Sequence, residues 1–122
     1  MKLIETIPVL RIFDEQKARE FYIDFLGFAV DWQHRFADDF PLYMQISMGA
    51  CHIHLTEHHG DCCPGSALII DTTELEAYQQ SLLAKRYRHS RPGCEKTEWD
   101  TLEMTIADPF GNRLTFSERI HP

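Results

Sequence analysis

Short runs of apolar residues in the first half of the chain predict four strands, and one longer run has the spacing of a helix. The helical run follows Asp14, a typical N-cap residue, and Gly27 predicts its C-terminal end. Because Pro8 has no backbone N–H, we expect a free edge, a bulge or a change of sheet in the first strand. The expected elements, in order, are a strand over Leu3–Ile12, a helix with the buried stripe Ala18, Phe21, Tyr22, Phe25 and Leu26, and strands over Phe28–Phe36, Leu42–Met48 and Cys51–Glu57.

The second half repeats this order after a polar loop that ends in Pro64-Gly65. Thr73 is the expected N-cap of its helix, with Glu76 placed for a capping box. The expected elements are a strand over Ser66–Asp71, a helix with the buried stripe Leu75, Tyr78, Leu82 and Leu83, a strand over Arg86–Pro92, a strand over Glu98–Ala107 with Leu102, Met104 and Ile106 on one face, and a strand over Asn112–Glu118.

The two halves match each other when the sequence is shifted by 57 positions, which places Asp14 on Asp71 and Phe25 on Leu82. A half alone is too small to fold comfortably, so the halves should form one domain, 1–122. The pattern therefore predicts an α+β fold of two βαβββ modules, about 1–60 and about 61–122. Their curved mixed sheets should form clefts, either between the two halves or between two chains.

Charge and composition narrow the range of partners. The chain has 12 Lys and Arg against 19 Asp and Glu, a net charge of −7, which repels nucleic acid and anionic lipid. No stretch approaches the roughly 20 apolar residues that cross a membrane, and the N-terminus lacks a signal-peptide core. We therefore expect a soluble, cytoplasmic protein. Its acidity serves solubility, and acids that lined a cleft would also attract a cationic small molecule.

The four cysteines lack a CxxC pair, and Cys62 and Cys63 are adjacent, which is a poor geometry for a bridge between them. We expect reduced thiols. His58, His59 and Asp61 precede the adjacent pair, so a metal site in this loop is the alternative. The cysteines are Cys51, Cys62, Cys63 and Cys94.

His52 and His54 lie two apart and therefore on one face of the same predicted strand. With Glu57, His58 and His59 they form the densest group of possible metal ligands in the chain. The spacing matches no recognised metal motif. We therefore expect His52 and His54 to line the cleft as hydrogen-bonding groups, with metal binding by the cluster as the alternative.

The chain contains three motifs in this order: Ile7-Pro8-Val9-Leu10, Phe21-Tyr22 followed by Leu26-Gly27-Phe28, and Asp108-Pro109-Phe110-Gly111-Asn112. Together they resemble the glyoxalase/bleomycin-resistance, or vicinal oxygen chelate, superfamily, and the resemblance covers essentially the whole chain. It implies paired strand–helix–three-strand modules, usually in a homodimer, with ligand sites in the clefts of the curved sheets. The last motif is expected to be a structural turn, in which the side chains of Asp108 and Asn112 bind the local backbone.

The metalloenzymes of this superfamily use His, Gln or Glu side chains from the first and last strands of each module. The best-matching positions here are Ile7, His54, Ser66 and Thr115, of which only His54 is a good ligand; a two-residue shift would add Glu5 and His52. The resemblance therefore implies no metal site, no cofactor and no catalytic residue. The alternative is a metal-dependent lyase, isomerase or extradiol-type dioxygenase centred on His54.

The chain most resembles the bleomycin-resistance proteins, which sequester a bulky cationic drug. Trp32 and Trp99 match the spacing of their aromatic positions, and Phe40 falls near a third. We expect a metal-independent protein that binds a cationic or aromatic ligand in a dimer cleft. Alternatively, Trp32 and Trp99 are core residues and Phe40 only braces a loop. The expected ligand-binding residues are Asp31, Trp32, Phe40, His54, Trp99 and Glu103.

Overall fold

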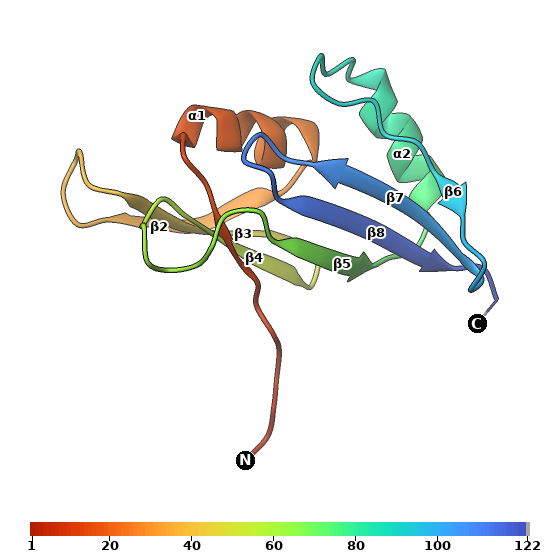
Figure 1. The fold of residues 1–122 in the computed structure, drawn as a ribbon, viewed down its shortest axis with the longest axis horizontal. Helices are drawn as coiled ribbons and strands as arrows, with labels where there is room; N and C mark the ends of the chain where they lie inside the picture. Colours follow the sequence, from red (N-terminus) through yellow and green to blue (C-terminus); the bar gives the residue numbers. More distant parts are fainter. Residues whose placement is uncertain (122) are drawn as a thin grey trace. The chain divides into compact units, whose positions relative to one another are not determined.

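The computed structural model describes residues 1–121 and contains two compact units, Met1–Pro64 and Gly65–Pro122. Each unit holds one open four-stranded sheet, with the strand orders β1-β4-β3-β2 and β5-β8-β7-β6 (Figure 1). In both sheets the first strand of the unit pairs in parallel with the last, and the other pairs are antiparallel. The predicted α+β fold of two βαβββ modules is confirmed.

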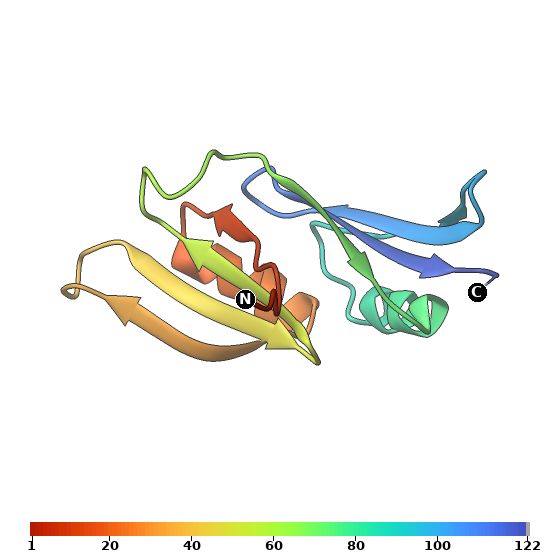
Figure 2. The same ribbon diagram turned by 90° about the horizontal axis from the view of Figure 1, so that it is seen from below.

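In the first unit a continuous helical segment covers one face of the sheet (Figure 2). The N-cap prediction is correct, because the Asp14 carboxylate accepts a hydrogen bond of 2.9 Å from the backbone N–H of Lys17. Gly27 ends the segment with a φ of 93°, a left-handed conformation that glycine adopts freely. The elements are β1 (Val9–Arg11), α1 (Glu15–Ala18), the π-helical η1 (Arg19–Phe25), β2 (Ala29–Arg35), β3 (Leu42–Met48) and β4 (Cys51–Thr56).

The first strand is much shorter than the predicted Leu3–Ile12. Pairing with β4 begins at Pro8, whose carbonyl oxygen accepts a 2.9 Å bond from the N–H of His54. Proline cannot donate to the sheet in return, and the seven residues before it are exposed and belong to no strand, although Glu5 contacts His52 of β4 (Figure 1). The break expected at Pro8 is thus present, but residues 3–8 form no strand.

The core of the first unit lies between the helical segment and one face of the sheet. Leu42, Met44 and Ile46 alternate along β3 and are fully buried. They meet the buried stripe of the helical segment, in which the rings of Phe21 and Tyr22 touch edge to face at 4.9 Å. The predicted stripe is confirmed, and the other face of the sheet stays open.

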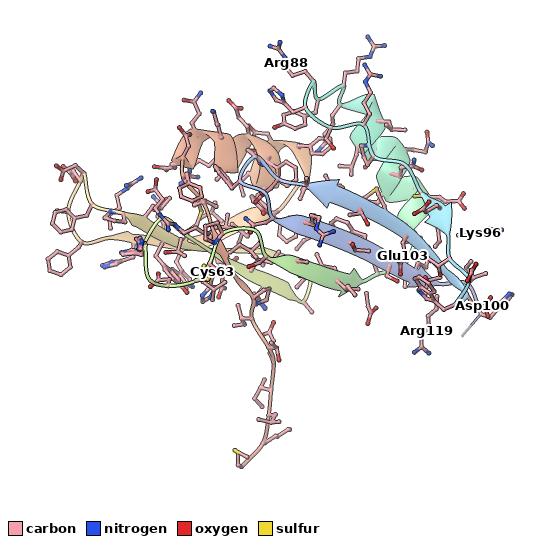
Figure 3. All side chains as sticks on the ribbon, viewed as in Figure 1. Cys63, Arg88, Lys96, Asp100, Glu103 and Arg119 are labelled. Atoms are coloured by element: carbon pink, nitrogen blue, oxygen red, sulfur yellow. The ribbon has the colours of Figure 1, made fainter. Side chains whose placement is uncertain are left out.

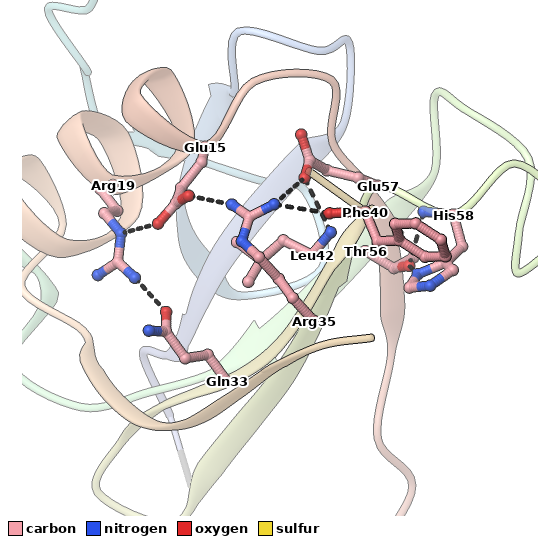
Figure 4. A network of polar contacts seen from close by, with 9 residues as sticks. All are labelled: Glu15, Arg19, Gln33, Arg35, Phe40, Leu42, Thr56, Glu57 and His58. Carbon is pink, nitrogen blue, oxygen red and sulfur yellow. Dashed lines mark hydrogen bonds and ion pairs between the residues drawn. The ribbon is translucent and has the colours of Figure 1, made fainter. Parts of the chain in front are cut away.

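A polar network ties the start of α1 to the ends of β2 and β4 (Figure 4). Glu15 accepts bonds from Arg19 and Arg35, and Arg35 also donates to the carbonyl of Phe40 at 2.8 Å and pairs with Glu57 at 3.6 Å. The hydrogen bond from Arg19, and then the bond and charge of Arg35, hold the pKa of Glu15 below its usual value against the opposing effect of burial. The network therefore stabilises the fold near neutral pH, and this contribution is lost as falling pH protonates Glu15.

The second unit contains β5 (Ala67–Asp71), α2 (Leu75–Ala84), β6 (Glu95–Lys96), β7 (Thr101–Ala107) and β8 (Arg113–Arg119). The predicted strand over Arg86–Pro92 is wrong, because Arg86 adopts a left-handed φ of 53° and Pro92 has no N–H to donate. β6 follows instead and pairs with β7. The predicted strand from Glu98 starts only at Thr101, after a turn in which Asp100 has a φ of 64°.

The predicted cap of α2 is also wrong. Neither Thr73 nor Glu76 caps the helix; the carboxylate of Glu118, on β8, accepts from the N–H groups of Glu74 at 2.9 Å and Leu75 at 3.1 Å. Glu74 adopts a left-handed φ of 56° at this point. A carboxylate at a helix N-terminus also complements the helix dipole.

The predicted stripe of α2 is correct in part. Leu75 and Leu82 are buried, and the half-buried ring of Tyr78 lies 5.4 Å from Phe116, where burial raises the pKa of its phenol. Leu83 was expected in the core, but it is 37% exposed. On β7, Met104 and Ile106 are buried as expected.

The turn between β7 and β8 is built as predicted. The Asp108 carboxylate accepts bonds of 2.8 Å from the N–H groups of Phe110 and Asn112. The Asn112 side chain returns a bond of 2.8 Å to Asp108 and accepts one of 3.0 Å from the N–H of Ser66. The turn therefore also fixes the start of β5 against β8.

Within residues 1–121, no helix is both long enough and apolar enough to cross a membrane.

We predict that Glu118→Ala lowers the free energy of unfolding by about 1–2 kcal/mol, because two N–H groups of α2 lose their acceptor. Urea unfolding followed by far-UV circular dichroism measures the change. Glu98→Ala, which removes an exposed acid in the turn before β7, is the control and should change it by less than about 0.5 kcal/mol. An equal loss in both variants would show that the cap contributes nothing.

Candidate functional site

The open face of the first sheet collects polar and aromatic side chains from three strands. A tight turn at Gly49-Ala50 joins β3 to β4 and sets Gln45 opposite His54. Side chains alternate across a sheet, so the buried alternation of Leu42, Met44 and Ile46 leaves Tyr43, Gln45 and Ser47 on the open face. His54 and His52 of β4 share that face through their pairing with Gln45 and Ser47.

A β-bulge brings a third strand to the same site. Val30 pairs with Ile46 and Trp32 pairs with Gln45, so Asp31 is an extra residue in β2. Neighbouring residues in a regular strand point to opposite faces, but a bulge places two of them on one side. Asp31 and Trp32 therefore both reach the open face.

Three rings meet there. The indole of Trp32 stacks on the phenol of Tyr43, with 6.0 Å between ring centroids and an interplanar angle of 7°. The His54 imidazole touches both rings edge-on at 5.2 Å. Trp32 remains 44% exposed, so much of the indole is left open to a further partner.

A chain of hydrogen bonds with a fixed direction runs beneath these rings. Asp31 can only accept, so the Gln45 group facing it at 2.9 Å is the amide N–H. The Gln45 carbonyl oxygen then faces His54 Nε2 at 2.9 Å, and this nitrogen must carry a proton. In neutral histidine Nδ1 is then an acceptor, and it accepts from the Tyr43 hydroxyl at 2.7 Å.

The surroundings of His54, Tyr43 and Asp31 shift their pKa values in the sense that this direction of the hydrogen bonds requires. Burial, and then the charge of His52, lowers the pKa of His54 and favours its neutral form. Burial, with the nearby Asp61, raises the pKa of Tyr43, so the hydroxyl keeps the proton that it donates. Hydrogen bonds from Gln45, and from Ser47 at 2.9 Å, lower the pKa of Asp31 and keep it ionised.

The outward-facing chemistry of the site follows from these bonds. The hydroxyls of Tyr43 and Ser47 donate their hydrogen bonds to partners within the site, so only their lone pairs remain for a ligand. The Asp31 carboxylate adds a negative charge beside the indole. The site therefore offers an aromatic face together with acceptors, which suits a ring that carries N–H donors or positive charge.

Comparison with known proteins identifies the family. The family model of the glyoxalase superfamily matches residues 1–122. The chain belongs to the glyoxalase superfamily. No curated protein matches it by sequence.

Solved structures share the fold at low sequence identity. A bleomycin-binding protein complexed with bleomycin matches with a TM-score of 0.74 and 17% identity, over 96% of this chain and 99% of that one. The bleomycin resistance determinant encoded on the transposon Tn5 matches with a TM-score of 0.72 and 14% identity, over 96% and 98%. A superfamily member from Sphaerobacter thermophilus DSM 20745 matches with a TM-score of 0.69 and 15% identity, over 96% and 98%.

The residues of this chain do not fit the metal site found in some members of the superfamily. Both ring nitrogens of His54 are engaged, by Tyr43 and Gln45, so neither offers a free lone pair. Ile7 has no donor atom, and the hydroxyl of Thr115 bonds to that of Thr105 at 3.0 Å. A metal at these positions would have to break the hydrogen bonds that order the site.

The histidine and cysteine alternatives gain no support either. His52 pairs with Glu5 at 2.8 Å, and His58 lies 3.1 Å from the Thr56 hydroxyl. Cys62 and Cys63 are free thiols, and burial raises the pKa of Cys62. Nowhere between residues 1 and 121 do three His, Cys, Asp or Glu side chains form a group that could hold a metal ion.

The predicted site residues lie in three places. Asp31, Trp32 and His54 come together on the open face of the first sheet, as just described. Phe40 lies in the loop between β2 and β3, where its ring stacks on Phe36 at 5.7 Å. Its role in ligand binding stays a prediction.

The other two predicted residues belong to the second unit. Trp99 lies in the turn between β6 and β7 and is 68% exposed, so the alternative of a core residue is wrong for it. Glu103, labelled in Figure 3, accepts bonds of 3.0 Å from the hydroxyls of Thr101 and Ser117. A ligand contact for either residue stays a prediction.

Sequence reasoning missed Tyr43, Gln45 and Ser47, although a signal for them was present. All three are the polar members of the alternating run Leu42–Met48. The tight turn at Gly49-Ala50 fixes the pairing of that run with the strand that holds His52 and His54. The three residues could therefore have been placed beside the histidines from the sequence.

We predict that ¹⁵N-edited NMR spectra at neutral pH show His54 protonated on Nε2 and not on Nδ1. The pKa of His54 should lie below its usual value of 6.5, because burial and the charge of His52 disfavour the protonated ring. His52→Gln removes the second of these effects and should raise the pKa of His54. A proton on Nδ1 would contradict the hydrogen-bond direction derived above.

Proposed function

We propose that this protein is a metal-independent binder of small molecules, which holds its ligand on the open face of the first sheet and does not transform it. The observation that carries the proposal is the half-exposed indole of Trp32, backed by Tyr43 and flanked by the ionised Asp31. The ligand class is a flat aromatic molecule with cationic or N–H-donating groups.

The physical basis is stacking combined with charge. An aromatic pair contributes about 0.5–1.5 kcal/mol beyond the area it buries, and a cation over an indole about 0.5–2 kcal/mol. The Tyr43 ring holds one face of the indole, so a ligand does not have to immobilise it. This preorganisation reduces the entropic cost of binding.

Sequestration, as opposed to catalysis, is supported by the hydrogen bonds that His54 makes. His54 is neutral and fully hydrogen-bonded, which leaves it poorly suited either to bind a metal or to accept a proton from a substrate. The likeness to bleomycin-binding and bleomycin-resistance proteins supports the same class of function. We propose bleomycin as the probe ligand. We also propose that the protein is located in the cytoplasm.

We predict that bleomycin quenches the fluorescence of Trp32, and that Trp32→Ala weakens its binding about tenfold or more. Lost stacking and cation–π energy of about 1.5–2 kcal/mol accounts for such a change. The chain has two tryptophans, so Trp99→Phe leaves Trp32 as the single reporter in a titration. Isothermal titration calorimetry gives the dissociation constant of the variant that lacks Trp32.

The matched control is Trp32→Phe, which keeps an aromatic face and should lose less affinity than Trp32→Ala. A chelator such as EDTA should leave the dissociation constant unchanged, because the site uses no metal. The proposal fails if Trp32→Ala binds as tightly as the wild type, or if EDTA abolishes binding.

We further propose that the protein is a homodimer, as the family resemblance implies. Analytical ultracentrifugation at micromolar concentration should show a species of about twice the chain mass of 14.3 kDa. A species of one chain mass under these conditions would overturn this part of the proposal.

A further inference from the structure

The longest stretch of the chain without an acidic residue contains a group of basic ones. No Asp or Glu occurs from residue 77 to residue 94, although the chain has 19 of them. Four of the 12 Lys and Arg residues of the chain lie in the middle of this stretch. We call residues 85–91 the cationic segment; its charged and titratable members are Lys85, Arg86, Arg88, His89 and Arg91.

The arginines of the cationic segment are exposed and unpaired. Arg86, Arg88 and Arg91 all lie on the surface of the second unit. Within residues 1–121 none of the three belongs to an ion pair, in contrast to Arg19 and Arg35 of the first unit, which both bind Glu15. Figure 3 shows Arg88 extending away from the ribbon beyond the end of α2.

The cationic segment is held in a defined shape. Gln79 of α2 donates a 3.0 Å bond to the carbonyl of Pro92, which ties the far end of the segment to the helix. The rings of Tyr87 and His89 touch edge to face at 5.3 Å within the segment. The charges are thus presented by an ordered loop, which lowers the entropic cost of binding a partner.

Helix stability explains only part of this arrangement. Lys85 and Arg86 lie where α2 ends, and positive charge there complements the helix dipole. Arg86 nevertheless adopts a left-handed φ of 53°, at a position where glycine is favoured. Arg88 and Arg91 lie beyond the last turn, where the dipole has little effect.

We propose that the cationic segment is a docking surface for an acidic stretch, a run of Asp and Glu residues, in a partner protein. The planar guanidinium of arginine donates two parallel hydrogen bonds to a carboxylate, so three arginines in six residues match neighbouring carboxylates. This surface belongs to the second unit and does not depend on the ligand site proposed above.

Two other anionic partners fit the molecule less well. A nucleic acid is a long polyanion, and the chain outside the cationic segment is even more acidic than the net charge of −7 suggests, so it would repel the flanking phosphates. A membrane surface usually also takes up apolar side chains, and residues 85–91 expose no large apolar one. An acidic peptide can be as short as the cationic segment, so it can bind there without meeting the acidic remainder of the chain.

The test measures fluorescence anisotropy of a labelled hexa-aspartate peptide at about 50 mM salt, with a hexa-serine peptide as the uncharged reference. The full chain is compared with the combined variant Arg86→Gln, Arg88→Gln and Arg91→Gln. The matched control is Lys2→Gln, Arg113→Gln and Arg119→Gln, which removes three exposed cations elsewhere and gives the same net charge. Far-UV circular dichroism checks that both variants fold.

We expect the wild type to bind hexa-aspartate but not hexa-serine. The segment variant should bind hexa-aspartate at least about tenfold more weakly, and the control variant within about twofold of wild type. Equal losses in the two variants, or no binding by the wild type, would overturn the proposal. Tighter binding to a single-stranded DNA oligonucleotide or to phosphatidylglycerol vesicles than to hexa-aspartate would assign the surface to another class of partner and overturn it as well.

Discussion

The carboxylate of Asp31 can only accept hydrogen bonds, and the polarity of the candidate site depends on that restriction. It orients the Gln45 amide, which in turn sets the proton position on His54 and the direction of the Tyr43 hydroxyl. One ionised group thus determines what three other side chains present to a ligand. An anionic ligand would meet lone pairs and like charge on this face, so it fits the geometry less well than a cation does.

A carboxylate also orients neighbouring side chains in the second unit. On its open face the carboxylate of Glu103 accepts hydrogen bonds from the hydroxyls of Thr101 and Ser117, as Asp31 accepts them from Gln45 and Ser47. In each sheet an acid on the open face therefore accepts hydrogen bonds from side chains of its own sheet. The aromatic cluster, however, occurs in the first unit, because the bulge in β2 turns Trp32 and Asp31 to one side.

Most of the fold could be predicted from the sequence, because the residues that specify most of its elements lie close together in the chain. The Asp14 cap, the stripe from Ala18 to Leu26 and the Asp108–Asn112 turn depend on residues close together in the chain. The cap of α2 could not be predicted, because its acceptor lies on a strand more than 40 residues away. The bulge at Asp31 leaves no clear trace in the pattern, and without it Asp31 and Trp32 would be assigned to opposite faces.

The first turns of the two helices are capped by residues at very different distances along the chain. α1 receives its acceptor from Asp14, three residues before the N–H that it binds, so this turn can form as soon as the local chain collapses. α2 depends on Glu118, which becomes available only after β8 has reached its place in the sheet. Closing that long loop costs entropy before the helix gains its cap. The N-terminal end of α2 should therefore consolidate late on the folding pathway, and the second unit should nucleate around its strands.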